Sequence, residues 1–408
     1  IESVIFLDED DVAIVSKKQT NIYDKFGERV NRKKKSVDLN SDIISKGNYQ
    51  HFMLKEIHEQ PEVFGYATSS FINFKTHKIE MLNEIKELDN VDRLIFVACG
   101  TAYYACAVAK FWFEKYVKVP VEIDVASEFR YRDTPFSKNE YAIFVSQSGE
   151  TADTLAALRK VKGKVNKTIS IVNVVESSIA RESEFVLPIK AGPEIGVAST
   201  KAFTAQLAVL ACLAINFSNK RGLISRKENS ELIDELVSVP GIMSNIIKKT
   251  PIYKEFAKKL MKAKNALFLG RGILYPLALE AALKLKEISY IHAEGYPSGE
   301  LKHGPIALVD KKMPVICFAP VNNLFEKTIS NVQEVQARNG KVLLITDDEG
   351  ASCLNSSEIS MIKLPKFSNF ISPIIYAIPS QLIAYYTALY KGTDIDKPRN
   401  LAKSVTVE

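Results

Sequence analysis

The most informative stretch for chemistry is the hexapeptide 146–151, Ser-Gln-Ser-Gly-Glu-Thr. It follows an apolar run, 141–145, that predicts a buried strand, and it precedes residues 152–159, which have the pattern of a helix start. Hydroxyl groups, one side-chain amide and free backbone N–H groups therefore meet at a helix N-terminus, where the helix dipole favours negative charge. Gly149 would let the backbone approach a ligand closely.

These features indicate a site for an anion. Because the hexapeptide contains no Lys or Arg, neutral donors would have to hold the ligand, and a phosphate monoester fits that description. The alternative is an ordinary turn between a strand and a helix, in which the serines only cap the helix. This stretch alone leaves both interpretations open.

A second candidate for chemistry is the strongly helix-forming segment 279–288. Glu280, Lys284 and Glu287 fall at positions i, i+4 and i+7, which is one stripe of a helix, and apolar residues flank the stripe on both sides. This placement predicts charged groups that point into a closed space, with Lys286 off the stripe and exposed. An exposed helix with ordinary ion pairs is the alternative.

Three further stretches are weak signals when taken singly. Segment 299–305 places His303 in a loop bracketed by glycines, although a lone loop histidine is often structural or solvated. Segment 196–203 opens a helix that Ser199 or Thr200 could cap. The last residues, 396–408, would by themselves be interpreted as a frayed tail.

The surrounding pattern indicates the elements that would position these residues. From about 81 to 220, and again from 266 to 391, apolar runs alternate with stretches of helical periodicity, which predicts parallel sheets covered by helices on both faces. The predicted strands are 93–98, 121–125, 141–145, 168–172 and 185–189 in the first half, and 266–270, 314–319, 341–346 and 359–364 in the second.

The two alternating halves resemble each other when the chain is shifted by 172 positions. Residues 96–103 then overlie 268–275, and residues 127–130 overlie 299–302. A common offset at two separate places predicts a duplicated α/β domain. The anion turn is not repeated, so only one half would keep it.

The remaining segments predict less. Residues 3–7 and 11–15 look like two short strands, and the polar segment 17–46 looks like a linker. A short helix is expected over 49–60, stopped by Pro61. We also expect a boundary region at 216–230, helix over 231–262, and an irregular segment from 392 to 408.

The length, net charge and apolar stretches of the chain are those of an ordinary globular protein. A chain of 408 residues predicts more than one domain, since about 100–200 residues per domain is usual. The net charge of +6 is spread along the chain, with one dense run at 29–35 that fits a solvated loop better than a nucleic-acid arm, because no aromatic residues interleave. The longest uncharged apolar stretch, 207–217, is shorter than the roughly 20 residues of a membrane span.

The numbers of cysteines and histidines bear on the cellular location of the chain and on metal binding. Five cysteines without regular spacing predict reduced thiols and a cytoplasmic location. Five histidines without paired Cys/His spacing give no sign of a metal site. We therefore expect neither a metal, a membrane nor a nucleic acid among the partners of this chain.

Taken together, the motifs resemble one family, the isomerase half of the glutamine–fructose-6-phosphate aminotransferases (isomerising). The resemblance runs from about residue 45 to the last residue, and it implies an α/β fold of two tandem sugar-isomerase (SIS) domains, each a five-stranded parallel sheet in an αβα sandwich. The motifs that carry it are 98–101, 146–151, 196–203, 284–287, 299–305 and 399–408.

The resemblance also implies a division of the chain. Residues 1–44 would be the end of a glutaminase domain with a linker, residues 45–225 and 226–391 the two SIS domains, and residues 392–408 a catalytic tail. In this family the glutaminase nucleophile is an N-terminal cysteine, whereas here residue 1 is Ile and no Cys precedes Cys99. We therefore expect no glutamine hydrolysis by this chain. Ala102 is a further departure, since many relatives carry a serine there.

Residue roles follow from the same resemblance. Lys403 would form a Schiff base with the C2 ketone of fructose 6-phosphate, and for this its amine must be neutral, through burial or a neighbouring positive charge such as Lys284. Glu287 would move a proton between C1 and C2, Lys284 would stabilise the developing charge, and His303, from the partner subunit, would open the sugar ring. The remaining implied contacts are Ser146, Gln147, Ser148 and Thr151 to the phosphate, and Thr101, Val197, Ser199 and Ala402 to the sugar hydroxyls.

The implied activity is conversion of fructose 6-phosphate to glucosamine 6-phosphate, the first step of amino-sugar synthesis toward UDP-N-acetylglucosamine. Ammonia would come from glutamine by way of the glutaminase domain, and without ammonia the product would be glucose 6-phosphate. The resemblance implies a homodimer and no cofactor, neither pyridoxal phosphate nor a metal. Two alternatives share the fold: a non-catalytic sugar-phosphate sensor, and a deglycase acting on phosphorylated amino-sugar adducts.

Overall fold

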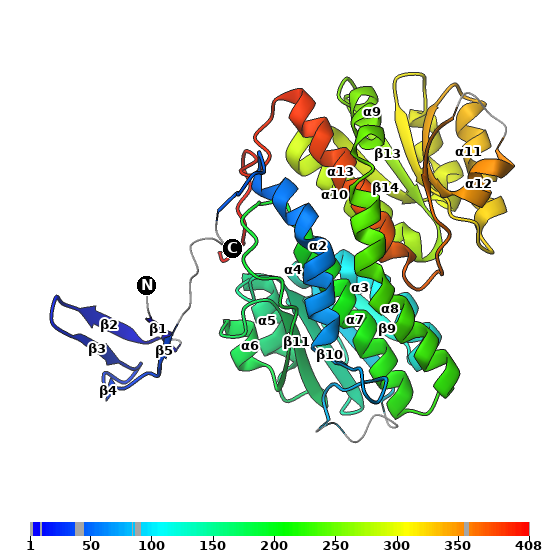
Figure 1. The fold of residues 1–408 in the computed structure, drawn as a ribbon. Helices are drawn as coiled ribbons and strands as arrows, with labels where there is room; N and C mark the ends of the chain where they lie inside the picture. Colours follow the sequence, from blue (N-terminus) through cyan, green and yellow to red (C-terminus); the bar gives the residue numbers. More distant parts are fainter. Residues whose placement is uncertain are drawn as a thin grey trace. The chain divides into compact units, whose positions relative to one another are not determined.

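The computed structural model describes residues 3–8, 10–36, 45–83, 85, 91–354 and 359–407 (Figure 1). The chain forms two compact units, Ile1–Asn48 and Tyr49–Glu408. All of the candidate site residues belong to the second unit, and each unit is considered by itself below.

The first unit is made of short antiparallel strands. β1 (Ser3–Ile5) pairs with β5 (Lys34–Ser36), while β2 (Val12–Val15), β3 (Thr20–Tyr23) and β4 (Arg29–Val30) form a three-stranded sheet. The two predicted strands are confirmed, but the predicted linker over 17–46 is wrong for its described part, which holds β3, β4 and β5.

Local ion pairs explain why the basic segment 29–35 is ordered. Arg32 lies 2.9 Å from the carboxylate of Asp8 and 2.7 Å from that of Asp11, so the acidic turn after β1 holds the basic segment in place. The run is largely exposed, as predicted, but its ends belong to β4 and β5 and only residues 31–33 form a loop. Residues 37–44 of the expected linker lie outside the described residues.

The second unit contains two five-stranded parallel sheets, as predicted. In both sheets the inner strands are covered on both faces, which is why most of their residues are apolar, whereas the edge strands 121–125 and 292–297 also carry charged residues. The first sheet has the order β12-β11-β10-β8-β9, and its strands are β8 (Arg93–Ala98), β9 (Val121–Val125), β10 (Glu140–Ser146), β11 (Lys167–Val172) and β12 (Phe185–Pro188). The second has the order β14-β13-β15-β16-β17, and its strands are β13 (Asn265–Gly270), β14 (His292–Pro297), β15 (Pro314–Phe318), β16 (Lys341–Asp347) and β17 (Ser360–Leu364).

Alternate residues of a strand pack into different cores. In β8, Leu94 and Phe96 face a large central core, whereas Ile95 and Val97 face a smaller one against α4, α5 and α6. The central core also contains one face of the second sheet, and the helices between the two sheets fill it (Figure 1). The helices of this unit are α2 (Phe52–Ser69), α3 (Gly100–Trp112), α4 (Ala126–Phe129), α5 (Ala152–Val161), α6 (Ser178–Glu182), α7 (Lys201–Lys220), α8 (Arg226–Ile247), α9 (Thr250–Leu260), α10 (Tyr275–Ser289), α11 (Phe325–Gln336), α12 (Asp348–Cys353) and α13 (Ser372–Lys391), with a hairpin of β6 (Ile72–Asn73) and β7 (Lys78–Ile79).

The predicted duplication is confirmed by the topology. β8 and β13 begin at Arg93 and Asn265, which are 172 positions apart, and the two sheets have the same strand order. The same shift carries β9 onto β14, a strand that the apolar pattern did not predict. In the second domain the first glycine after β13 is Gly272. A Cβ atom at this position would lie 2.8 Å from the side chain of Leu324, so that side chain fills the space beside the glycine.

The predicted stop at Pro61 is wrong, because α2 continues through that residue to Ser69. A proline inside a helix leaves the carbonyl four residues earlier without its amide donor. Here the Gln60 side chain donates to that carbonyl, on Ile57, at 3.1 Å. The side-chain amide thus replaces the missing backbone bond and lets the helix continue.

Two other expectations concern the helices around 201–262. The predicted helical stretch 231–262 is confirmed as parts of α8 and α9, but the boundary region expected at 216–230 is shorter, since α7 runs to Lys220 and α8 begins at Arg226. Among the described residues, α7 is the one helix with the length and composition of a membrane span, yet 94% of its apolar window is buried inside the unit, as in a core helix.

Candidate functional site

The serine-rich turn joins the carboxyl end of β10 to the N-terminus of α5. Ser146 Oγ accepts a hydrogen bond from Gly149 N at 3.0 Å and lies 3.1 Å from Thr151 Oγ1. Ser148 Oγ accepts from Glu150 N at 3.2 Å. Thr151, the residue before the first turn of α5, makes no side-chain capping bond, so the hydroxyls organise the turn itself rather than cap the helix.

Gly149 is required by the shape of this turn. Its φ is +67°, a region that residues with a Cβ rarely adopt, and a Cβ would lie 1.9 Å from Ser177 Oγ. Gly163 also has a positive φ, +77°, but nothing lies within 4 Å of its Cβ position. An alanine at either position would therefore have a strained backbone, but only an alanine at position 149 would also collide with a neighbouring side chain.

We expect Gly149→Ala to weaken sugar-phosphate binding by at least about tenfold, because the turn must move to relieve the collision. Gly163→Ala is the matched control and should lose only the stability that corresponds to the backbone strain, about 1 kcal/mol. Calorimetric titration with fructose 6-phosphate and thermal unfolding of both variants measure the two effects. Equal binding by the two variants would show that the turn does not hold the ligand.

The C-terminal tail docks on this turn and is not frayed. Ala152 N, at the start of α5, donates to Val405 O at 3.1 Å, and Ser404 Oγ lies 3.0 Å from Ser148 Oγ. Further back, the carboxylate of Asp396 accepts from the backbone N–H groups of Phe52 and Met53 at the start of α2. The tail is therefore fixed at both ends.

Lys403 lies in this docked tail and faces a carboxylate. Its Nζ is 2.6 Å from Glu194 Oε2 and donates to Gly196 O at 2.8 Å. Ser199 Oγ donates to the same Glu194 oxygen at 3.0 Å, and Val197 N donates to Asp396 O at 3.0 Å. The tail and the loop before α7 thus form one site beside the serine-rich turn.

Two buried carboxyl groups, Glu194 and Glu56, accept hydrogen bonds from backbone N–H groups of the loop that contains Gly196 and of the start of α7. Burial alone would raise the pKa of Glu194, but Lys403 and two backbone N–H donors outweigh it and hold the pKa below its usual value. Glu56, on α2, accepts from Ile195 N and Gly196 N through Oε1. Burial, with the charge of Glu194 beside it, raises the pKa of Glu56 to about 8. One carboxyl is thus charged near neutral pH and the other holds a proton.

This difference predicts a pH effect on stability. The folded state keeps a proton on Glu56 that the unfolded chain releases above about 4.5, so stability should fall as pH rises from about 4.5 to about 8. In Glu56→Gln, which preserves an oxygen acceptor for Ile195 and Gly196, the loss of melting temperature between about pH 6 and about pH 8 should be smaller than in the original chain. Part of the loss should remain, because burial also raises the pKa of Glu280 to about 8.

Thermal unfolding at several pH values checks this expectation. Glu62→Gln, an exposed change on the same helix, serves as the control and should leave the pH profile unchanged. A Glu56→Gln profile identical to that of the unchanged protein would contradict the assignment of the proton to Glu56.

The predicted stripe on α10 is confirmed as an inward-facing group. Lys284 is 1% exposed and pairs with Glu287 at 2.6 Å and Glu280 at 3.5 Å, while Lys286 is exposed. Thr101, at the start of α3, accepts from Lys284 Nζ at 3.1 Å and donates to Glu280 at 3.2 Å. The second domain therefore supplies its charged groups to the first.

Electrostatics link this group to the tail. Burial alone would lower the pKa of Lys284, but Glu280 and Glu287 outweigh it and raise the pKa, and Glu194 adds to the same effect. Glu194 thus acts on Lys284 as well as on Lys403, so one buried carboxylate couples the two clusters electrostatically. The Lys284 ammonium remains charged and can stabilise an anion that forms nearby.

Most of the candidate residues from the sequence are connected in this way. Thr101, Lys284 and Glu287 are joined on one side, and Ser146, Ser148 and Thr151 on the other. Lys403 of the tail and Val197 and Ser199 of the loop before α7 belong to the group of contacts that joins the tail to this loop. Gln147 is in the turn, where its backbone O accepts from Asn173 N, and Ala402 is exposed beside Lys403.

His303 is not brought to these groups within the chain. It is exposed on a 3-10 turn, Ser298–His303, and in the described part of the chain it makes no hydrogen bond or ion pair. Sequence reasoning also missed Glu194 and Glu56. Glu194 is contacted by Lys403, which lies 209 positions later in the sequence, and Glu56 contacts Gly196, which lies 140 positions later. No local sequence pattern connects residues so far apart.

The fold and the site define a class. Residues 87–216 and 259–391 match the model of the SIS domain, and these ranges contain all the strands of both parallel sheets. The chain is therefore a protein with two SIS domains.

Comparison with individual proteins is more specific. The chain is 50% identical, over 408 residues, to the glutamine–fructose-6-phosphate aminotransferase (isomerizing) of Bradyrhizobium diazoefficiens, covering all of this chain and 67% of that protein. A solved C-terminal domain of glucosamine-fructose-6-phosphate aminotransferase from Francisella tularensis has a TM-score of 0.84 at 43% identity, over 87% of this chain and 99% of that one. The glucosamine-6-phosphate deaminase of Thermotoga maritima is similar at 26% identity and a TM-score of 0.66, over 87% of this chain and 99% of that one. The chain belongs to the glutamine–fructose-6-phosphate aminotransferase (isomerizing) family, of which it spans the isomerase part.

Proposed function

We propose that this chain isomerises fructose 6-phosphate, and that it forms glucosamine 6-phosphate when ammonia is delivered from glutamine. The observation that carries the proposal is the docking of Lys403 beside the anion turn. Its tail contacts Ser148 and the first residue of α5, so an amine lies near the turn that would bind the phosphate. Membership of the family supports the same substrate.

The phosphate would be bound by Ser146, Gln147, Ser148 and Thr151, whose hydroxyls and amide surround the start of α5. To act as a nucleophile, Lys403 must leave its ion pair and transfer a proton, and Glu194 is the carboxylate in contact with it. The neutral amine then forms a bond to C2 of the open-chain ketose, and loss of the C2 oxygen as water gives an imine.

The imine is exchanged before the proton moves: ammonia, or water when no ammonia is delivered, adds to C2 and Lys403 leaves as the free amine, which gives a C2 imine or a C2 ketone. Glu287 would then take a proton from C1, so that a C1–C2 double bond forms and the nitrogen or oxygen on C2 becomes an amine or a hydroxyl group. Glu287 returns a proton to C2 while the C1 hydroxyl becomes the aldehyde, which gives glucosamine 6-phosphate or glucose 6-phosphate. The buried Lys284 ammonium, held by Glu280 and Glu287, would stabilise the negative charge that develops during this transfer. Thr101, Val197, Ser199 and Ala402 would contact the sugar hydroxyls.

Ring opening requires a residue that the chain does not bring to the site itself. We assign it to His303 of a second copy, because an imidazole can both accept and donate a proton and because this side chain is exposed. The chain would then work as a homodimer. An assay of mixed dimers, in which one copy carries His303→Ala and the other Lys403→Ala, should recover part of the activity that each variant lacks.

The domain boundaries and location complete the proposal. Residues 45–225 and 226–391 would form the two SIS domains, residues 392–408 the catalytic tail, and residues 1–44 the end of a glutaminase domain that, in full-length relatives, would supply ammonia. All five cysteines are free thiols, which supports function in the cytoplasm.

A coupled assay for glucose 6-phosphate tests the proposal directly. We expect the purified chain to convert fructose 6-phosphate without ammonia, and to release no ammonia from glutamine. Tight binding of fructose 6-phosphate without any turnover would favour the sugar-phosphate sensor instead. Release of a sugar phosphate and a free amine from a phosphorylated amino-sugar adduct would favour the deglycase.

A further inference from the structure

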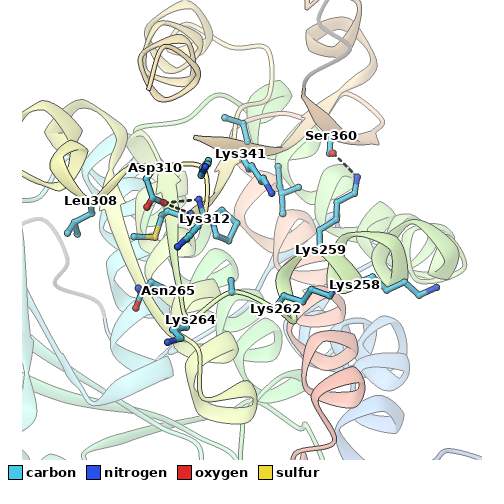
Figure 2. Close-up of a pocket in the computed structure, with 16 residues that line it drawn as sticks. Lys258, Lys259, Lys262, Lys264, Asn265, Leu308, Asp310, Lys312, Lys341 and Ser360 are labelled. Carbon is cyan, nitrogen blue, oxygen red and sulfur yellow. Dashed lines mark hydrogen bonds between the residues drawn. The ribbon is translucent and has the colours of Figure 1, made fainter. Parts of the chain in front are cut away.

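The second domain has a lysine-rich concavity at the opposite edge of its sheet from the carboxyl ends of the strands. Its volume is about 1030 Å³ (Figure 2). The first residues of four neighbouring strands line it, namely Asn265, Pro314, Lys341 and Ser360. The candidate site uses the carboxyl end of β10 in the other sheet, so the two sites are distinct.

The charge of this pocket is unusual for the chain. Seven lysines and one aspartate line it, a net of +6, which equals the net charge of all 408 residues. The aspartate, Asp310, is used internally, because its carboxylate accepts from the N–H groups of Lys312 and Met313. Seven of the 54 basic residues of the chain therefore meet around one hollow that has a single acidic residue in its lining.

Few of these lysines have an anionic partner. Lys259 pairs with Glu255 at 3.0 Å and donates to Ser360, and Lys258 lies 5.8 Å from the ring centre of Tyr390. The other five make no ion pair among the described residues. They are Lys262, Lys264, Lys311, Lys312 and Lys341.

The fold explains only part of the cluster. Lys258 and Lys259 are in the last turn of α9, where the helix dipole favours cations without any ligand. That reason does not apply to Lys311, Lys312 and Lys341, which come from the turn before β15 and the start of β16. Figure 2 shows Lys312 and Lys341 on the strand side of the pocket and Lys259 on the helix side.

The floor of the pocket is apolar. Met313, Val342 and Leu343 are buried there, and Leu308 is 53% exposed at its side. Lysine side chains around an apolar floor suit a ligand with several negative charges and a flat or apolar group. We infer that this pocket binds a small polyanion with two or more linked phosphate groups, such as inorganic tripolyphosphate or a nucleoside triphosphate.

Calorimetric titration of the whole chain with sodium tripolyphosphate at low salt tests this inference. We expect one site per chain whose affinity falls as salt is added, because screening weakens attraction between exposed charges. The variant Lys262→Gln/Lys312→Gln/Lys341→Gln should bind at least about tenfold more weakly. The control Lys162→Gln/Lys248→Gln/Lys327→Gln, which removes three exposed lysines outside the pocket, should bind as the unchanged chain does.

Two further arms separate this site and its ligands. Glucose 6-phosphate, which should occupy the serine-rich turn, should not displace tripolyphosphate, so the test does not depend on the isomerase activity. If a nucleoside triphosphate binds more tightly than tripolyphosphate, and Leu308→Ser removes the difference, the apolar side of the pocket at Leu308 holds the base. Equal affinities assign the recognition to the phosphates alone. Unchanged melting temperatures show that the variants fold. Absence of binding at millimolar concentration, or equal loss in both triple variants, would overturn the inference.

Discussion

Lys403→Arg should abolish sugar isomerisation, with a loss of about 10³-fold or more, because a guanidinium does not form the imine that the proposed mechanism requires. Arginine keeps the positive charge, so the contact with Glu194 and the docking of the tail should persist. The change therefore separates the chemistry of the amine from its structural role.

Borohydride trapping of fructose 6-phosphate is the measurement that identifies the nucleophile. The unchanged chain should gain the mass of the reduced sugar phosphate, and Lys403→Arg should not, while calorimetry should show that the phosphate still binds. Lys397→Arg, at an exposed lysine earlier in the same tail, is the matched control and should trap the sugar normally. Trapping that persists in Lys403→Arg would move the nucleophile to another lysine.

Glu287→Gln should lower isomerisation by about 10²–10⁴-fold, the contribution expected of a residue that transfers the proton. The amide has the same shape but cannot accept the proton from C1. Because Lys403 is unchanged, the imine should still form and borohydride should still trap it. Loss of activity with retained trapping is the pattern that only a proton-transfer role predicts.

The neighbouring ion pair must be controlled for. Lys284 lies 2.6 Å from Glu287 and 3.5 Å from Glu280. Removing the Glu287 charge also removes one of the causes that raise the pKa of Glu280, so Glu280 can serve as the carboxylate partner of Lys284 in the variant. Thermal unfolding should therefore show a modest loss of stability. Glu326→Gln, an exposed change on α11, should alter neither activity nor trapping. If Glu287→Gln keeps full activity, another group moves the proton.

The sequence predicted the sheets well because their strands are buried on both faces. Nine of the ten parallel strands were recognisable as apolar runs, but β14 was not, since His292 and Glu294 interrupt it at the edge of its sheet. The shift by 172 positions carries β9 onto β14 and could have found it. The course of α2 could not be foreseen, because it depends on a side-chain bond from Gln60 to Ile57 that replaces the one lost at Pro61.

The site was predictable where its residues are adjacent in sequence. The turn at 146–151 and the stripe on α10 depend on local spacing, which helices and strands convert into a common face. Glu194 and Glu56 were not predictable in this way. Their importance depends on a tail and a helix that meet one loop from opposite ends of the unit, and no local pattern records that meeting.

The contact of α10 with Thr101 has a consequence for modularity. Lys284 and Glu280 belong to the second copy of the duplicated domain, but the hydroxyl that they hold belongs to the first. Neither copy expressed alone would contain all the groups that the proposed reaction uses. Because the contact joins the two copies, recombination that exchanges one of them for a homologue should succeed only when both sides of this contact are inherited together.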